Sequence, residues 1–212
     1  MERLTTTTLA PGRHRFTGQI AGAGFADGTR IVLGRWQRSP LGAFTDAMVE
    51  RPDGHRVLLA PTEEVADVVS ALYRFDEVQV VPVVERLRRR TLVVRLGPLE
   101  LSLTAGPRRA LGWLLRAVPT PIARAHWWSW VTNPIASIAL AGVHTRGTTA
   151  SGQQATYGAT DLHSLADAHA RWDGVDLGRF GDVAPSVGFG FGSTPPQPSL
   201  TSITTTVTVP LA

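Results

Sequence analysis

The 212-residue chain contains no cysteine and no lysine. Without cysteine it cannot form disulfide bonds, thiolate metal sites or a cysteine nucleophile. All 21 basic residues are arginine, whose guanidinium group stays protonated and does not act as an amine nucleophile. The first residues also lack a positively charged segment followed by an apolar run. We therefore expect no secretory signal and a cytoplasmic location.

The composition is otherwise that of a globular protein, with 43% hydrophobic and 18% charged residues. We expect a single domain over residues 1–212, with residues 1–12 flexible. The 21 glycines and 15 prolines indicate many turns, and therefore many short strands rather than long helices. The predicted fold class is mostly β: a single-domain antiparallel barrel, closed or cone-like, decorated by three or four short helices. Such a barrel can enclose a cavity for a small ligand.

Turn signals and apolar spacing predict the order of the elements. A Gly-rich turn at residues 21–28 is expected between two strands, and an Arg-Pro-Asp-Gly turn at residues 51–54 is expected to close a hairpin. A helix is expected over residues 62–72, because its first residue is a threonine that can cap it. Further short helices are expected at residues 108–118 and 161–171.

The sequence disfavours a membrane, a nucleic acid and a metal ion as partners. Residues 127–143 carry no charge, but Asn133-Pro134 interrupts them, so a buried segment is favoured over a membrane span. Residues 86–90 are where nucleic acid would bind, but no aromatic residue interleaves their arginines and acidic residues are interspersed throughout the chain. His163 and Asp167 are expected one helical turn apart, as a surface contact rather than a metal site. We expect neither a metal nor a cofactor, because no binding motif is present.

The candidate site lies in the strand that follows a Ser-Pro-Leu-Gly turn. Strand alternation places Phe44, Asp46 and Met48 on one face. An ionised aspartate is almost never buried without a partner, so Asp46 lies either in a pocket or on a solvated face, and the sequence leaves both open. If Asp46 faces a pocket, an arginine is its expected partner, and Arg35 and Arg38 stand nearby in the sequence.

Aromatic side chains complete the candidate set. Trp128 and Tyr157 are expected either to line an apolar cavity or to belong to the core. Asp46 is the one candidate catalytic residue. The candidate ligand-binding residues are Arg35, Arg38, Phe44, Met48, Trp128 and Tyr157.

The turn and strand resemble a motif of the acetoacetate decarboxylase-like family, Ser-x-x-Gly-x-(Tyr/Phe)-x-Glu. Ser39, Gly42, Phe44 and Asp46 stand at the matching positions, with aspartate as the acid, and the order of elements is similar over residues 30–105. The resemblance implies a cone-like antiparallel barrel around a small apolar pocket, in which the acid works with an arginine and a lysine that forms a Schiff base with a keto acid. Because this chain has no lysine, Schiff-base decarboxylation is excluded on chemical grounds.

Two hypotheses about function remain, with a weaker third. The favoured one is a binding protein that holds a small carboxylate, a carbonyl compound or an apolar metabolite in the barrel, anchored by Arg35 or Arg38. The second is a lysine-free enzyme that enolises, hydrates or isomerises its substrate with Asp46 as general base. The third is an interaction module that uses residues 86–90. The expected partner is thus a small molecule, and the sequence leaves open whether the chain forms a homo-oligomer.

Overall fold

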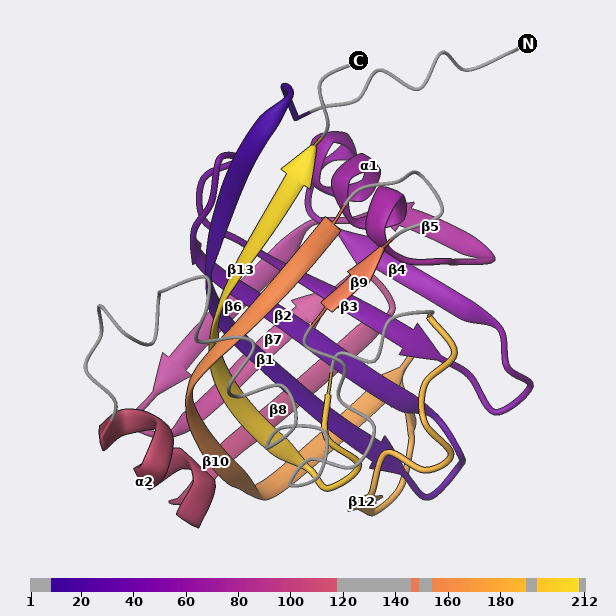
Figure 1. Ribbon diagram of the computed structural model, residues 1–212. Helices are drawn as coiled ribbons and strands as arrows, with labels where there is room; N and C mark the ends of the chain where they lie inside the picture. Colours follow the sequence, from indigo (N-terminus) through magenta and orange to yellow (C-terminus); the bar gives the residue numbers. More distant parts are fainter. Residues whose placement is uncertain (1–8, 118–145, 149–153, 190–193, 210–212) are drawn as a thin grey trace, which may run out of the picture.

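Ten strands lie side by side in a strongly curled sheet that forms a half-barrel (Figure 1). The computed structural model describes residues 9–117, 146–148, 154–189 and 194–209. The strands are β1 (Gly12–Phe25), β2 (Arg30–Arg38), β3 (Phe44–Glu50), β4 (Arg56–Ala60), β5 (Glu77–Val80), β6 (Val83–Arg88), β7 (Thr91–Leu96), β8 (Leu99–Arg108), β9 (Arg146–Thr148), β10 (Gln154–Trp172), β11 (Val175–Asp176), β12 (Phe180–Gly181) and β13 (Ser199–Val209). Across the sheet their order is β5-β4-β3-β2-β1-β13-β10-β8-β7-β6, and the short strands β9, β11 and β12 pair with β10 or β1.

The concave face of the sheet carries the main hydrophobic core. Leu33 of β2 and Leu59 of β4 pack there in one cluster with Val94 of β7, Leu101 of β8 and Ala168 of β10. Strands from both halves of the order therefore meet across the interior. This contact is what makes the sheet curl, because one set of side chains covers the apolar face of both halves.

The convex face of β1–β4 is covered by helix α1 (Glu63–Leu72). Thr62 caps the helix by accepting a hydrogen bond from the backbone N–H of Val65, as its position in the sequence predicts. The buried side of α1 includes Val65 and Val69, which pack against Val32 and Leu58 of the sheet. The convex face therefore holds a second apolar layer.

A second helix, α2 (Ala110–Ala117), follows β8 and contacts β10. Figure 1 shows it beside β10, well away from α1. The Arg108 guanidinium lies 4.6 Å from the ring centroid of Trp113 on this helix, which is within range of a cation–π interaction. The predicted helix at residues 108–118 is thus present in shorter form. Among the described residues, no helix is long and apolar enough to cross a membrane.

The helix predicted at residues 161–171 is wrong, because β10 occupies this stretch. The pairing of β10 with β8 is irregular between Leu165 and Asp167. Side chains on one face of a regular strand are two residues apart. Because of a bulge here, the successive core side chains Leu165 and Ala168 are three residues apart. That spacing imitates the period of a helix. His163 and Asp167 are consequently not on adjacent turns of a helix.

The Gly-rich turn predicted at residues 21–28 is also wrong for most of its length. β1 continues to Phe25 before the chain turns. A side chain at Gly24 would collide with the backbone carbonyl of Asp182, which crosses close to β1. Glycine is therefore needed here for a close approach of two backbones rather than for a turn.

The predicted mostly β, barrel-like fold is confirmed in the form of a half-barrel. Two details differ from the prediction. β4 and β5 pair in parallel, since α1 connects them, whereas the other pairs are antiparallel. The described residues contain two helices rather than three or four.

Candidate functional site

The pairing of β2 with β3 places Asp46 and Arg35 on opposite faces of the sheet. Gly34 is opposite Asp46 in the register, and Arg35 is opposite Thr45. Because side chains alternate along a strand, Asp46 points to the convex face under α1, while Arg35 points to the concave face. The residues that the sequence groups into one site therefore belong to two cavities.

The first cavity, which we name the helix–sheet pocket, lies between α1 and the convex face. Its volume is about 40 Å³, enough for roughly one or two water molecules. Asp46 is buried there, and Trp36 Nε1 donates a hydrogen bond of 3.0 Å to its Oδ1. The lining residues are Phe16, Ile20, Val32, Gly34, Trp36, Phe44, Asp46, Met48, Val68, Val69, Leu72, Tyr73, Thr205 and Val207.

Gly34 makes the hydrogen bond between Trp36 and Asp46 sterically feasible. A Cβ atom at position 34 would lie 2.5 Å from Asp46 Oδ1 and 2.8 Å from Trp36 Nε1. Any larger residue would therefore push the two side chains apart. Two residues of β2 therefore position the carboxyl group of Asp46. Gly34 leaves space for it, and Trp36 donates a hydrogen bond to it.

Burial raises the pKa of Asp46 from 3.8 to about 7, against the opposing effect of the hydrogen bond from Trp36. No residue that lines this pocket is basic. The carboxyl group is therefore close to half-protonated at neutral pH. A group with such a pKa can accept or donate a proton under physiological conditions.

The second cavity, which we name the basic cup, opens on the concave face and has a volume of about 300 Å³. Leu92, Leu103 and Leu165 of the main core form part of its wall. Its remaining lining residues are Gln19, Arg35, Leu87, Arg89, Arg90, Ala105, Gly106, Asp161, His163, Leu200 and Ser202. The cup therefore combines a leucine-rich wall with several cationic and hydrogen-bonding side chains.

An ion pair holds Arg35 in place at the cup. Arg35 Nη2 donates a 2.9 Å hydrogen bond to Glu85 Oε1, and Nε contacts both carboxylate oxygens at 3.2 Å. Thr45 Oγ1 donates a further hydrogen bond of 2.8 Å to Glu85. The hydrogen bonds from Arg35 hold the pKa of Glu85 below its usual value. These hydrogen bonds fix the orientation of Arg35, because the planar carboxylate of Glu85 holds one edge of its planar guanidinium group.

The acidic residue of the cup is also paired. Arg108 Nε and Nη2 donate hydrogen bonds of 2.8 and 2.9 Å to the two oxygens of Asp161. These bonds lower the pKa of Asp161. His163 Nε2 lies 3.4 Å from the same carboxylate, and His163 Nδ1 is 3.1 Å from the backbone oxygen of Gly106. Asp161 therefore does not leave an uncompensated negative charge in the cup.

Arg89 and Arg90 form the turn between β6 and β7 at the rim of the cup. Both side chains are exposed, and neither forms an ion pair with a described residue. Arg89 has a φ angle of 53°, a left-handed conformation that glycine or asparagine adopts with less strain. The rim thus carries two cations that the described part of the protein does not neutralise.

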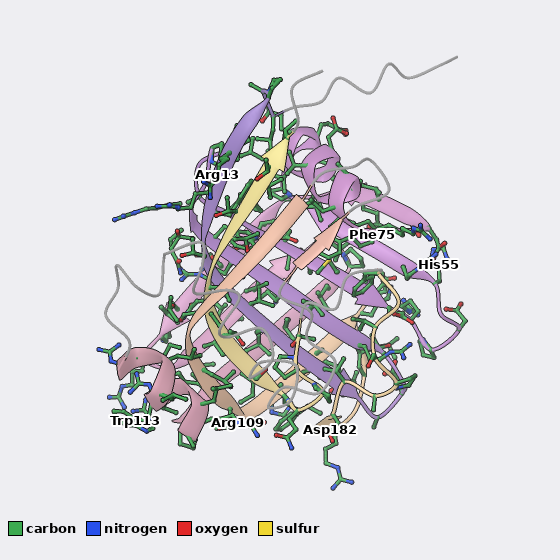
Figure 2. All side chains as sticks on the ribbon, viewed as in Figure 1. Arg13, His55, Phe75, Arg109, Trp113 and Asp182 are labelled. Atoms are coloured by element: carbon green, nitrogen blue, oxygen red, sulfur yellow. The ribbon has the colours of Figure 1, made fainter. Side chains whose placement is uncertain are left out.

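A third, more open cavity lies at the opposite end of the half-barrel, with a volume of about 480 Å³. It reaches the turn between β7 and β8, whereas the cup reaches the turn at the other end of β7. The Arg51 guanidinium lies 4.8 Å from the ring centroid of Trp172, and His55 Nε2 lies 3.1 Å from Glu77. Figure 2 shows His55 far from Trp113 of α2. The charged side chains of this third cavity are largely paired, so the cavity is a weaker candidate than the cup.

The structure brings Phe44, Asp46 and Met48 together in the helix–sheet pocket, as strand alternation predicts. The expected pairing of an arginine with Asp46 is wrong. Arg35 pairs with Glu85 on the other face, and Arg38 is exposed at the end of β2.

The aromatic candidates cannot be placed in either cavity. Tyr157 belongs to β10, but its side chain lies outside the described part of the protein. Trp128 and the rest of residues 127–143 also lie outside the described residues.

Sequence reasoning missed several residues of both cavities. Trp36 is directly opposite Phe44 in the pairing of β2 with β3, so the two side chains share a face. The register of this hairpin would have identified Trp36. Glu85 and Thr205 come from distant strands, and no local signal in the sequence connects them with β2 and β3.

No protein-family model and no curated protein sequence matches the chain. Within the described residues, no group of three or more histidines and acidic residues is arranged to hold a metal ion. The geometry defines a half-barrel with a leucine-walled basic cup on one face and an aromatic, carboxyl-containing pocket on the other.

Proposed function

We propose that the protein binds a small amphipathic carboxylate in the basic cup, with the carboxylate group at the arginines and the apolar part against the leucines. The observation that supports this most directly is the combination of Arg35, Arg89 and Arg90 with a leucine-rich wall in one cavity. A volume of about 300 Å³ is at the lower end of the range for small-molecule sites. The ligand is therefore a molecule of moderate size.

The charges in and around the cup favour an anion. Glu85 neutralises Arg35, and Arg108 neutralises Asp161, so these four groups add little net charge. The two rim arginines remain, and their guanidinium groups match a carboxylate in charge and in planar geometry. Arg35 contributes mainly by its fixed position beside the leucines.

The apolar wall favours a carboxylate with a hydrocarbon part over a fully polar anion. Five leucines line the cup, of which Leu87 is 58% exposed. Burying a fully exposed leucine contributes about 1.5–3 kcal/mol, so covering the exposed part of Leu87 contributes about 1–2 kcal/mol. A short-chain fatty acid or an aliphatic keto acid satisfies both requirements.

Calorimetric titration with hexanoate tests the proposal, with 1-hexanol as the neutral ligand of similar length. The double variant Arg89→Gln/Arg90→Gln is expected to bind hexanoate about 10- to 100-fold more weakly, because one or two charge-assisted hydrogen bonds are lost. The matched control is Arg86→Gln/Arg88→Gln, which removes the same charge from side chains that alternate to the outside of β6.

Two results would contradict the proposal. If hexanol binds as tightly as hexanoate, the arginines do not select an anion. If the control variant loses as much affinity as the rim variant, the effect comes from the net charge of the protein and not from the cup.

The lysine-free enzyme is a second candidate because the pKa of Asp46, about 7, suits a general base. The geometry gives it less support, since neither an arginine nor a histidine, which could act as electrophile, lines the pocket of Asp46. Turnover that survives Asp46→Asn would remove this candidate. Four expectations from the sequence stay predictions: nucleic-acid binding through residues 86–90, the family resemblance, the cytoplasmic location and a homo-oligomer.

A further inference from the structure

We infer that the helix–sheet pocket is a second binding site, independent of the basic cup, and that it takes a small alkylammonium cation held by the carboxylate of Asp46 and the surrounding aromatic side chains. The inference rests on two features of the pocket: its charge and its walls. Each is independent of whether hexanoate binds on the other face of the sheet.

The first feature is a buried acid that lacks a cationic partner among the described residues. The side chain that donates a hydrogen bond to Asp46 is the neutral indole of Trp36, and the lining of the pocket contains no arginine or histidine. The other buried acid of the sheet, Glu50, is paired with Arg30 at 2.9 Å. A positive charge stabilises a buried carboxylate, whereas a carboxyl group without one takes up a proton more readily. An ammonium ligand supplies that charge at Asp46.

The second feature is a wall of aromatic rings beside the carboxyl group. The ring centroids of Phe16, Trp36 and Phe44 lie between 5.9 and 6.5 Å apart. The plane of Phe16 is inclined by 75° to Trp36 and by 83° to Phe44, so the rings form adjoining walls rather than a stack. Aromatic walls next to a carboxylate favour an alkylated cation, because ring faces attract positive charge and alkyl groups.

The volume limits the size of the cation. About 40 Å³ corresponds to one or two water molecules, and so to a cation of about two non-hydrogen atoms. Methylammonium has this size. Larger amines would need α1 to move away from the sheet.

Ionisation of Asp46 sets the pH dependence of binding. The lining from β1, β2, β3, β13 and α1 contains one other titratable side chain, Tyr73. With a pKa of about 7 for Asp46, the ionised fraction falls roughly tenfold between pH 8 and pH 6. The affinity for an ammonium ion that stays protonated over this range is expected to fall by the same factor.

Calorimetric titration with methylammonium chloride at pH 8 and at pH 6 tests the inference, with methanol as a neutral ligand of the same size. We expect saturable binding of methylammonium to the full chain, no binding of methanol, and about tenfold weaker affinity at pH 6. Asp46→Asn is expected to abolish binding, whereas Asp67→Asn on the exposed side of α1 is expected to leave it unchanged. Phe44→Leu keeps the carboxyl group and is expected to weaken binding about three- to tenfold by removing a ring.

Three results would overturn the inference. Equal binding of methanol would mean that the pocket does not select a cation. Binding that persists in Asp46→Asn, or that Asp67→Asn weakens equally, would mean that the cation associates with the surface. The absence of any saturable heat for methylammonium at pH 8, in a folded protein, would mean that the pocket does not accept a cation.

Discussion

Asp46 is a buried acid whose ionisation costs stability, so replacing it with asparagine is expected to stabilise the protein at alkaline pH. Asparagine has nearly the same shape, and its side-chain oxygen can still accept the hydrogen bond that Trp36 Nε1 donates to Asp46. It carries no charge at any pH. The substitution therefore removes the cost of burying a carboxylate and keeps the packing of the pocket.

The magnitude follows from the pKa of Asp46. Burial raises it from 3.8 to about 7, so the folded state holds the proton more tightly than the unfolded state. The contribution of this proton to stability is complete below pH ~4 and is lost as the pH rises through about 7. A difference of about 3 pH units, at about 1.4 kcal/mol per unit, gives a cost of about 4 kcal/mol at pH 8. At pH 5, only about one unit above the unfolded pKa, the cost is about 2 kcal/mol.

The assay compares the free energy of unfolding of the wild type and Asp46→Asn at pH 5 and pH 8. Urea titration followed by tryptophan fluorescence gives both values. The advantage of the variant is expected to grow by roughly 2–3 kcal/mol between the two pH values. This difference cancels any effect of asparagine that does not depend on pH. Asp67→Asn, an exposed change on α1, is the control and should show no such growth. A constant advantage of Asp46→Asn would refute the reasoning, because Asp46 would then be ionised in the folded protein at both pH values.

Two further predictions concern residues that position buried polar groups. Gly34→Ala is expected to destabilise the protein by about 1–3 kcal/mol and to change the tryptophan emission spectrum, because the new Cβ atom collides with Asp46 Oδ1 and Trp36 Nε1. An unchanged spectrum and stability would show that the two side chains can move apart freely. Glu50→Gln leaves the buried Arg30 without its 2.9 Å ion pair and is expected to lower the free energy of unfolding by about 3–5 kcal/mol. A urea titration that gives a loss below about 1 kcal/mol would mean that water already compensates Arg30.

The sequence allowed the β-rich fold and the shared face of Phe44, Asp46 and Met48 to be predicted, because both depend on local patterns. Phe44, Asp46 and Met48 alternate along one strand, and alternation decides which of them share a face. The same rule, applied to the preceding strand, places Arg35 and Trp36 on opposite faces. Once the register of the hairpin is known, Trp36 becomes the neighbour of Asp46 and Arg35 is excluded.

The errors arise where contacts between distant segments decide the local structure. The irregularity near Leu165 depends on the register with β8, and it turns a period of two into an apparent period of three. The ion pair of Arg35 with Glu85 joins residues 50 positions apart. Neither could be derived from a local window, since curling of the sheet brings the partners together only after many strands have paired.

The order of the sheet gives the arginine run a further consequence. The ten-strand path ends at β5 and β6, and a terminal strand exposes backbone N–H and C=O groups that can pair with another chain. On β6, Arg86 and Arg88 are exposed and alternate with Glu85 and Leu87. Repulsion between such rows of arginines on two molecules opposes intermolecular strand pairing and aggregation. The feature that resembles a nucleic-acid contact in the sequence thereby protects an incomplete barrel from growing into a continuous sheet.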